Sequence, residues 1–212
     1  MTERPILFSG SMVRALLAGR KTQTRRWARG FEVRGPDSAG ISDWYQHGRW
    51  VAAHRAGEES SATNLCPYGR AGDRLWVKEA CFLGDDDCPR HQLGEDGPCW
   101  CRHPERVIYR ADGEPPPGRR VEEFGWRPSI HCSRWASRIT LDVVEIRAQR
   151  LQEITEADAV AEGVSPGLDA ARDAYRALWD DLNGERAAWA TNPCVWAVSF
   201  KVILPNNPGR VK

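Results

Sequence analysis

Residues 137–147, SRITLDVVEIR, carry the clearest structural signal in the chain. Ile139, Leu141 and Val143 alternate with polar residues, which is the pattern of a strand that buries one face. Residues 196–202 show the same alternation of apolar and polar side chains. The two segments therefore predict two strands of one sheet.

Further elements surround these strands. Shorter apolar runs predict strands at 74–79 and 107–110, the first of them after a glycine-containing turn. Serine, threonine and glycine signals predict three helices. These helices are expected at residues 9–17, 155–163 and 168–182. Strands interspersed with helices favour an α+β fold, a small mixed β-barrel with helices at its sides.

Two stretches show no steady hydrophobic period, at about 30–64 and 82–104. Both are rich in glycine and polar residues, and we interpret them as loop insertions. A chain of 212 residues suits one domain, so residues 1–212 are expected to form a single domain with these two insertions.

Composition excludes several classes of protein. Thirty basic and 29 acidic side chains give a net charge of +1, which excludes a polybasic or strongly acidic chain. No apolar run has the roughly 20 residues of a membrane span, and residues 1–5 lack the apolar core of a signal peptide. We therefore expect a cytoplasmic protein without a membrane partner. Local clusters of arginine still allow contact with nucleic acid.

Residues 19–26, GRKTQTRR, hold the first candidate site. Lys21 and Thr24 are three residues apart, so one helical turn would place both side chains on the same side. The neighbouring arginines and partial burial both disfavour the charged form of a lysine. A neutral Lys21 would take the proton of the Thr24 hydroxyl and make it a nucleophile. The alternative is a basic turn that only binds phosphate or meets solvent.

Three segments together resemble the ASCH domain family, whose fold is similar to the PUA domain. They are residues 19–26, the turn and strand at 72–77, and the strand at 196–202. Further stretches look like the ASCH proteins that phages and prophages encode. These stretches are residues 66–69, 126–131 and 134–138. The resemblance implies a PUA-like barrel.

One branch of that family, the small bacterial N(4)-acetylcytidine amidohydrolases, uses a lysine, a threonine and a glutamate. The resemblance places these roles on Lys21, on Thr24 and on Glu162, which ends the predicted helix at 155–163. It implies that the threonine attacks the acyl carbon, that the lysine moves the proton, and that the glutamate orients the lysine or the exocyclic nitrogen. Glu79, after the strand at 74–79, is a second candidate glutamate; its alternative role is an ion pair at the end of that strand.

Substrate contacts are expected from arginines and one tryptophan. Guanidinium groups bind phosphates or base edges, and a tryptophan between them stacks on a base. The candidates are Arg20, Arg25, Arg26, Arg134, Arg138 and Trp135. Trp135 fits a place in the core equally well.

A cysteine-rich stretch provides a candidate metal site. Cys88, His91, Cys99 and Cys101 offer four soft ligands inside a loop that has no core of its own. A tetrahedral zinc ion would hold such a loop together, and free surface thiols are the alternative. The expected chemistry requires no cofactor, so a zinc ion here would be structural.

Three functions follow as expectations. The first is an amidohydrolase that removes an acyl group from the exocyclic amine of a cytosine nucleoside or related modified base. The second is a module that binds RNA, DNA or a modified nucleotide without turnover. The third is a ribonuclease, an activity known among relatives in the resembled family.

Overall fold

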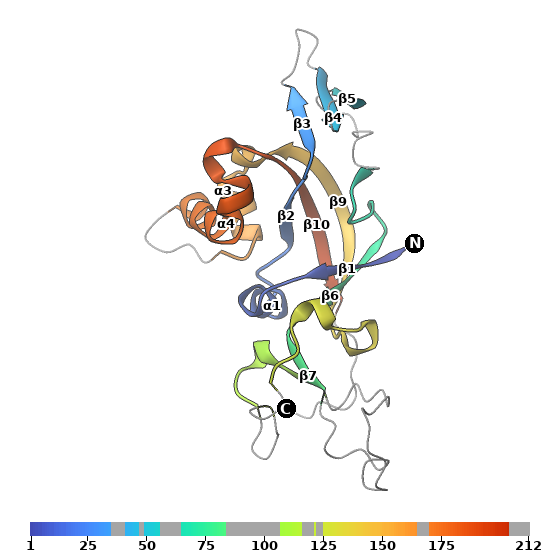
Figure 1. The fold of residues 1–212 in the computed structure, drawn as a ribbon, viewed down its shortest axis with the longest axis vertical. Coiled ribbons are helices and arrows are strands. Elements are labelled where there is room, and N and C mark those ends of the chain that lie inside the picture. The colour runs from blue at the N-terminus through green and yellow to red at the C-terminus, as the bar shows by residue number, and fades with distance from the viewer. Residues whose placement is uncertain are drawn as a thin grey trace, which may run out of the picture.

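A computed structural model describes most of the chain (Figure 1). The described residues are 1–34, 41–46, 49–55, 65–83, 107–115, 121, 125–164 and 170–203. They form an α+β structure built on a mixed sheet.

The central sheet has five strands in the order β1-β6-β9-β10-β2. Their bounds are Glu3–Leu7 for β1, Arg74–Lys78 for β6, Thr140–Arg150 for β9, Cys194–Ile203 for β10 and Gln23–Trp27 for β2. Only the β1–β6 pair is parallel, and the other pairs are antiparallel. The alternating segments predicted from sequence are confirmed as the long central strands β9 and β10.

Two smaller sheets flank this one. β3 (Phe31–Arg34), β4 (Ile41–Gln46) and β5 (Arg49–Arg55) form an antiparallel sheet at one end of the molecule (Figure 1). The expectation of an irregular loop over 30–64 is therefore wrong for these three strands. Antiparallel neighbours satisfy each other's backbone groups locally, so they need no strong apolar period. β7 (Cys81–Leu83) pairs with β8 (Val107–Tyr109), and β7 takes up the start of the second expected insertion.

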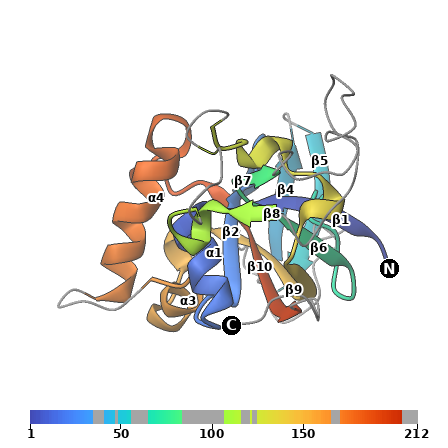
Figure 2. The same cartoon turned by 90° about the horizontal axis from the view of Figure 1, so that it is seen from below.

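The three predicted helices are present, but the last one begins at 171 and extends to 187 instead of ending at 182. α1 (Gly10–Leu17) begins at Ser9, and α3 (Glu156–Ala161) begins at Thr155, whose hydroxyl accepts from the backbone N–H of Asp158. The long helix α4 (Ala171–Ala187) lies beside α3 on one flank of the sheet (Figures 1 and 2). Within the described parts of the chain, no helix is both long and apolar enough to cross a membrane.

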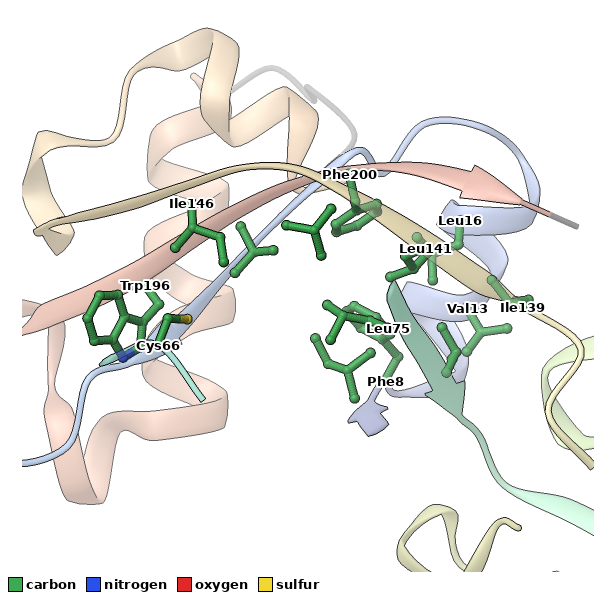
Figure 3. Close-up of a cluster of buried hydrophobic side chains, with 14 of the residues drawn as sticks. Phe8, Val13, Leu16, Cys66, Leu75, Ile139, Leu141, Ile146, Trp196 and Phe200 are labelled. Atoms are coloured by element: carbon green, nitrogen blue, oxygen red, sulfur yellow. The ribbon is translucent and has the colours of Figure 1, made fainter. Parts of the chain in front are cut away.

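The two faces of β10 contribute to two hydrophobic cores. Trp196, Val198 and Phe200 pack into the larger core, where Figure 3 shows Phe200 close to residues of α1 and β6. Val195, on the other face, packs under α3 and α4. Because β2 pairs with β10 along the edge of the sheet, β2 residues also alternate between these two environments.

The edges of the central sheet are linked by a side chain. β1 and β2 are the two edge strands, and no pairing between them is found among the described residues. Instead, the guanidinium of Arg26 on β2 donates a hydrogen bond to the carbonyl oxygen of Leu7 at the end of β1. The sheet is therefore curled strongly enough to bring its two edges together, without a closed ladder.

Candidate active site

Lys21 sits where α1, α3 and β2 meet. After α1 the chain turns at Gly19, whose φ is +69°, and the backbone N–H of Lys21 donates to the carbonyl of Ala15 at 3.1 Å. The next N–H, that of Thr22, donates to the carbonyl of Ala161 at the end of α3 at 2.8 Å. These bonds hold Lys21 in an irregular segment ahead of β2, so the helical turn expected to align Lys21 with Thr24 is wrong.

The amine of Lys21 is fully buried against Glu162. Its Nζ donates to the Glu162 backbone carbonyl at 2.8 Å and to the Glu162 carboxylate Oε2 at 2.8 Å. Glu162 ends α3, where backbone carbonyls lack partners inside the helix and attract cations. The last turn of α3 therefore supplies both acceptors for the Lys21 amine, and the pairing expected from sequence is present.

Arg25 holds the other side of the same carboxylate. Its Nη1 donates to Glu162 Oε1 at 3.2 Å and also to the side chain of Gln23. Its Nη2 lies 3.0 Å from Asp158 Oδ2, an ion pair whose angle is too poor for a hydrogen bond, and its Nε has no hydrogen-bond partner in the described structure. Arg147 also pairs with Asp158, at 3.1 Å.

This environment lowers the pKa of Lys21. Burial is the main cause, because it disfavours the charged amine. The Glu162 carboxylate opposes the shift, whereas the positive charges of Arg26 and Arg25 reinforce it, and the pKa of Lys21 remains below its ordinary value. Arg25 also shares the negative charge of Glu162, so that this charge stabilises the Lys21 proton less.

A cavity of about 360 Å³ opens beside these residues, between the end of β1, β2 and α4. Its wall combines apolar and polar residues in nearly equal number. The apolar part consists of Leu7, Phe8, Met12, Trp27, Leu178, Trp179 and Leu182. The polar part consists of Ser9, Thr24, Arg25, Arg26, Ser129, Glu162, Tyr175 and Asn183. A flat apolar group with one polar edge suits such a cavity.

Thr24 lies in the cavity wall and is only 2% exposed. Its hydroxyl makes no hydrogen bond to any residue that the structure describes. Lys21 is not in the cavity wall itself; it lies behind Phe8 and Glu162, with its Nζ 5.6 Å from the centre of the Phe8 ring. Because Lys21 and Thr24 are three residues apart, their Cα atoms are separated by at most about 11 Å.

The expected arginine contacts divide into two groups. Arg25 and Arg26 line the cavity, and Arg26 lies over the Phe8 ring at 5.1 Å. Arg20 is exposed and donates to the Gly163 carbonyl at 3.4 Å. Arg134 forms an ion pair with Glu3.

Arg138 and Trp135 do not line this cavity. Arg138 forms ion pairs with Glu79 and Asp112, which is the ion-pair alternative for Glu79. Trp135 is half-buried and packs against a core cluster that includes Tyr109. Their segments lead into the start of β9, where side chains meet β7 and β8 instead of β2.

Several cavity residues were not singled out by sequence. Phe8 follows β1, and Tyr175 and Trp179 come from α4. The two α4 residues do have a signal in the sequence. Tyr175, Leu178, Trp179 and Leu182 have the spacing of one face of a helix. Spacing alone does not distinguish a face packed on a core from one that also borders a cavity.

The candidate zinc ligands Cys88, His91, Cys99 and Cys101 lie outside the described residues. Within the described ranges, no group of three or more possible metal ligands is found. The cysteines described there are Cys66, Cys81, Cys132 and Cys194, and all four are buried and not disulfide-bonded.

Comparison with known proteins gives one distant likeness. No family model matches the chain, and no curated protein matches it. A crystal structure of a protein from Enterococcus faecalis V583, described under the family model DUF984, superposes with a TM-score of 0.41 at 10% sequence identity. The superposition covers 96% of this chain and 81% of that one. At this identity and TM-score the likeness assigns neither a family nor an activity to the chain.

Proposed function

We propose that the chain is an amidohydrolase that removes an acyl group from the exocyclic amine of a cytosine nucleoside or a related modified base. The observation that carries this proposal is the buried Lys21–Glu162 pair next to a cavity whose wall contains the Thr24 hydroxyl. Thr24 is the nucleophile, Lys21 the general base, and Glu162 positions Lys21.

The first half of the reaction forms an acyl-threonine. Thr24 Oγ1 bonds to the acyl carbon while its proton passes to neutral Lys21, and the π electrons of the carbonyl move onto its oxygen. When the carbonyl re-forms, the bond from carbon to the exocyclic nitrogen breaks. Lys21 then gives its proton to that nitrogen, and the free amine of the base leaves.

The second half regenerates the enzyme. A water molecule attacks the acyl-threonine ester, and Lys21 takes a proton from it. Collapse of the intermediate breaks the bond to Thr24 Oγ1, which recovers a proton from Lys21, and the acid product leaves. Each cycle therefore consumes one water molecule and restores both side chains.

The electrostatics support Lys21 as the base. A general base must be neutral at the working pH, and burial lowers the pKa of Lys21 in that direction. Glu162 fixes the amine with two hydrogen bonds, and Arg25 limits how strongly the carboxylate retains the Lys21 proton. Lys21 and Thr24 share no hydrogen bond in the described structure, and such bonds commonly tighten only when substrate is bound.

The shape of the cavity supports a nucleobase as the substrate. Phe8, Tyr175 and Trp179 supply aromatic surface, which stacks on bases. Thr24 and Glu162 supply the polar edge, where the exocyclic amide would lie. A volume of about 360 Å³ suits a small ligand.

We also propose that the central sheet is an open form of the PUA-like barrel and that the chain belongs to the ASCH family. Support comes from the curled sheet, in which Arg26 joins the two edge strands, and from residues 19–26 at the cavity. An experimental structure in which β1 and β2 diverge, with Arg26 turned to solvent, would contradict the barrel.

The test is release of acetate from N(4)-acetylcytidine by the full chain. We expect turnover by the natural sequence and none by Lys21→Ala or Thr24→Ala. Thr22→Ala is the matched control, because Thr22 is exposed and lies in the same motif. Mass spectrometry of a rapidly quenched reaction should show one acetyl group on the peptide that contains Thr24.

Three results would contradict the proposal. Equal background release by all four proteins would exclude the hydrolase. Tight binding of cytidine or RNA that survives Thr24→Ala, without release of acetate, would favour the binding module. Cleavage of RNA that survives Thr24→Ala would favour the ribonuclease.

A further inference from the structure

Tyr175 is a buried tyrosine whose hydroxyl has no hydrogen-bond partner among the described residues. It is 4% exposed, and its ring packs against Trp179 and Trp189, each at a centroid distance of 6.4 Å. Tyr109, another buried tyrosine, donates to the Ala136 carbonyl at 2.9 Å. Tyr175 lines the cavity and makes no hydrogen bond to a described residue, so the cavity wall holds a hydroxyl that the protein itself does not use.

Tyr175 shares the cavity wall with several charged groups. Tyr175 lines the cavity, and the charged groups that act on its hydroxyl are Glu162, Arg25 and Arg26, which line it as well. Burial, reinforced by Glu162, raises the pKa of Tyr175 well above its ordinary value. The side chain therefore stays protonated at neutral pH and can only donate its proton in a hydrogen bond or accept one.

The other polar groups in the wall are mostly engaged. The Ser9 hydroxyl caps α1, and the Asn183 amide donates to the Trp179 carbonyl at 3.2 Å. The Arg26 guanidinium is anchored on the Leu7 carbonyl. Apart from the nucleophile, the half-buried Ser129 and the indole of Trp27, this leaves Tyr175 as a neutral donor in the wall, and the charge of Glu162, the residue that holds Lys21, acts on it.

We infer that Tyr175 is a catalytic residue that donates a hydrogen bond to the acyl carbonyl oxygen of the substrate. The inference rests on the proposed function and adds a residue and a role to it. When Thr24 Oγ1 attacks, the π electrons of the carbonyl collect on this oxygen, and a fixed donor stabilises the new charge. The proton stays on Tyr175 throughout, and the bond weakens again when the carbonyl re-forms.

The test is Tyr175→Phe in the full chain with N(4)-acetylcytidine. This change keeps the ring and its contacts and removes only the hydroxyl. We expect kcat to fall on the order of 100-fold, the usual effect of losing one donor to an oxyanion, with KM nearly unchanged. Tyr109→Phe is the matched control, since it removes a tyrosine hydroxyl outside the cavity, and its kcat should equal that of the natural sequence.

A second substrate separates this role from packing. In N(4)-thioacetylcytidine a sulfur atom, a weaker acceptor, replaces the acyl oxygen. The loss caused by Tyr175→Phe should therefore be several-fold smaller on the thioacetyl substrate than on the acetyl substrate. A purely structural defect would lower both rates by the same factor and would overturn the inference.

The outcomes distinguish this inference from the proposed function. If the natural sequence releases acetate and Tyr175→Phe does so at the same kcat, the hydrolase stands and the role of Tyr175 is wrong. If Tyr175→Phe raises KM and leaves kcat unchanged, Tyr175 holds the base and not the reacting oxygen, which also overturns the inference. If the natural sequence releases no acetate, the proposed function fails, and this inference fails with it.

Discussion

Two buried ion clusters in this protein are built from similar residues but differ in what they can do. The Lys21 cluster consists of Lys21, Arg25, Asp158 and Glu162, and the Arg138 cluster consists of Glu79, Asp112 and Arg138. Each has a glutamate that is almost fully buried, Glu162 at 4% and Glu79 at 1% exposure.

In the Arg138 cluster, each nitrogen of the guanidinium donates to a carboxylate oxygen. Arg138 donates to both carboxylate oxygens of Glu79, at 2.8 and 2.9 Å, and to Asp112 at 2.9 Å. Its guanidinium also lies 3.9 Å from the centre of the Tyr109 ring. Burial alone would lower the pKa of Arg138, but these carboxylates outweigh burial and raise it. This cation keeps its charge at every pH at which the protein folds.

In the Lys21 cluster, the hydrogen bonding of the cations is less complete. Arg25 has nitrogens without hydrogen bonds, and burial lowers the pKa of Lys21. One of its two cations is a lysine, which can lose its proton, and the cluster borders a cavity through Arg25 and Glu162. The comparison teaches that a buried ion pair is a scaffold when its cation cannot lose its charge, and a reactive centre when the cation can and a ligand can approach.

The largest expected effect is on turnover. Lys21→Met should lower kcat/KM for N(4)-acetylcytidine by about 100-fold to 10,000-fold, the range for loss of a general base. Lys78→Met is the control, because Lys78 is half-buried, bonds to the Ile130 carbonyl and lies outside the cavity. Steady-state rates decide, and similar losses in both variants would remove the distinction between the clusters.

The second effect is on stability. Glu79→Gln should lower the free energy of unfolding by about 3–5 kcal/mol, because Arg138 remains charged and loses its main partner. Glu162→Gln should lower it clearly less, because Lys21 can shed its proton in response and Arg25 keeps its ion pair with Asp158. Urea unfolding at neutral pH measures both. A greater loss for Glu162→Gln would show that the two cations respond alike.

The third effect is on stability and turnover, through the close packing of Gly163 against Lys21. Gly163 has a φ of +87°, and a Cβ added there would lie 3.0 Å from the Cβ atoms of Ala15 and Lys21. Gly163→Ala should therefore lower the free energy of unfolding by about 1–3 kcal/mol from backbone strain, and by more from these contacts. It should also reduce turnover, since Lys21 is displaced.

Gly19→Ala is the control for this third effect. Gly19 has a φ of +69°, but an added Cβ would meet no atom within 4 Å. It should show backbone strain alone, about 1–2 kcal/mol in thermal unfolding experiments. Equal losses at both positions would mean that contact with Lys21 contributes nothing.

The smallest effect is on the pH dependence of turnover. A neutral Lys21 is required, so kcat/KM should rise with pH through the pKa of Lys21, which lies below its ordinary value of 10.5. The Arg26 charge contributes to that lowering. Arg26→Gln should therefore move the midpoint of the rise to higher pH, whereas Arg134→Gln, on the exposed Glu3 pair, should leave it in place. A midpoint that Arg26→Gln leaves unmoved would argue against Lys21 as the titrating group.

Local patterns predicted the elements because each depends on neighbours in sequence. The alternation in 137–147 and 196–202 specifies strands, and the caps at Ser9 and Thr155 specify helix starts. The same reasoning failed for Lys21 and Thr24, whose spacing suggested a helical turn. The backbone N–H groups of Lys21 and Thr22 instead donate to the carbonyls of Ala15 and Ala161, and these hydrogen bonds hold the segment in another conformation. Neither partner lies within the segment whose spacing was used for the prediction.

Sequence by itself determined the strands β6, β8, β9 and β10 and the three helices, and the resemblance named Lys21, Thr24 and Glu162 as candidates. Only the tertiary structure decided which charged groups share an environment. It placed Glu162 against Lys21 from 141 residues away, added the α4 residues to the cavity wall, and put Arg138 and Glu79 in a separate closed cluster. The physical reason is that burial and Coulomb interactions depend on distance in space, which local spacing does not encode.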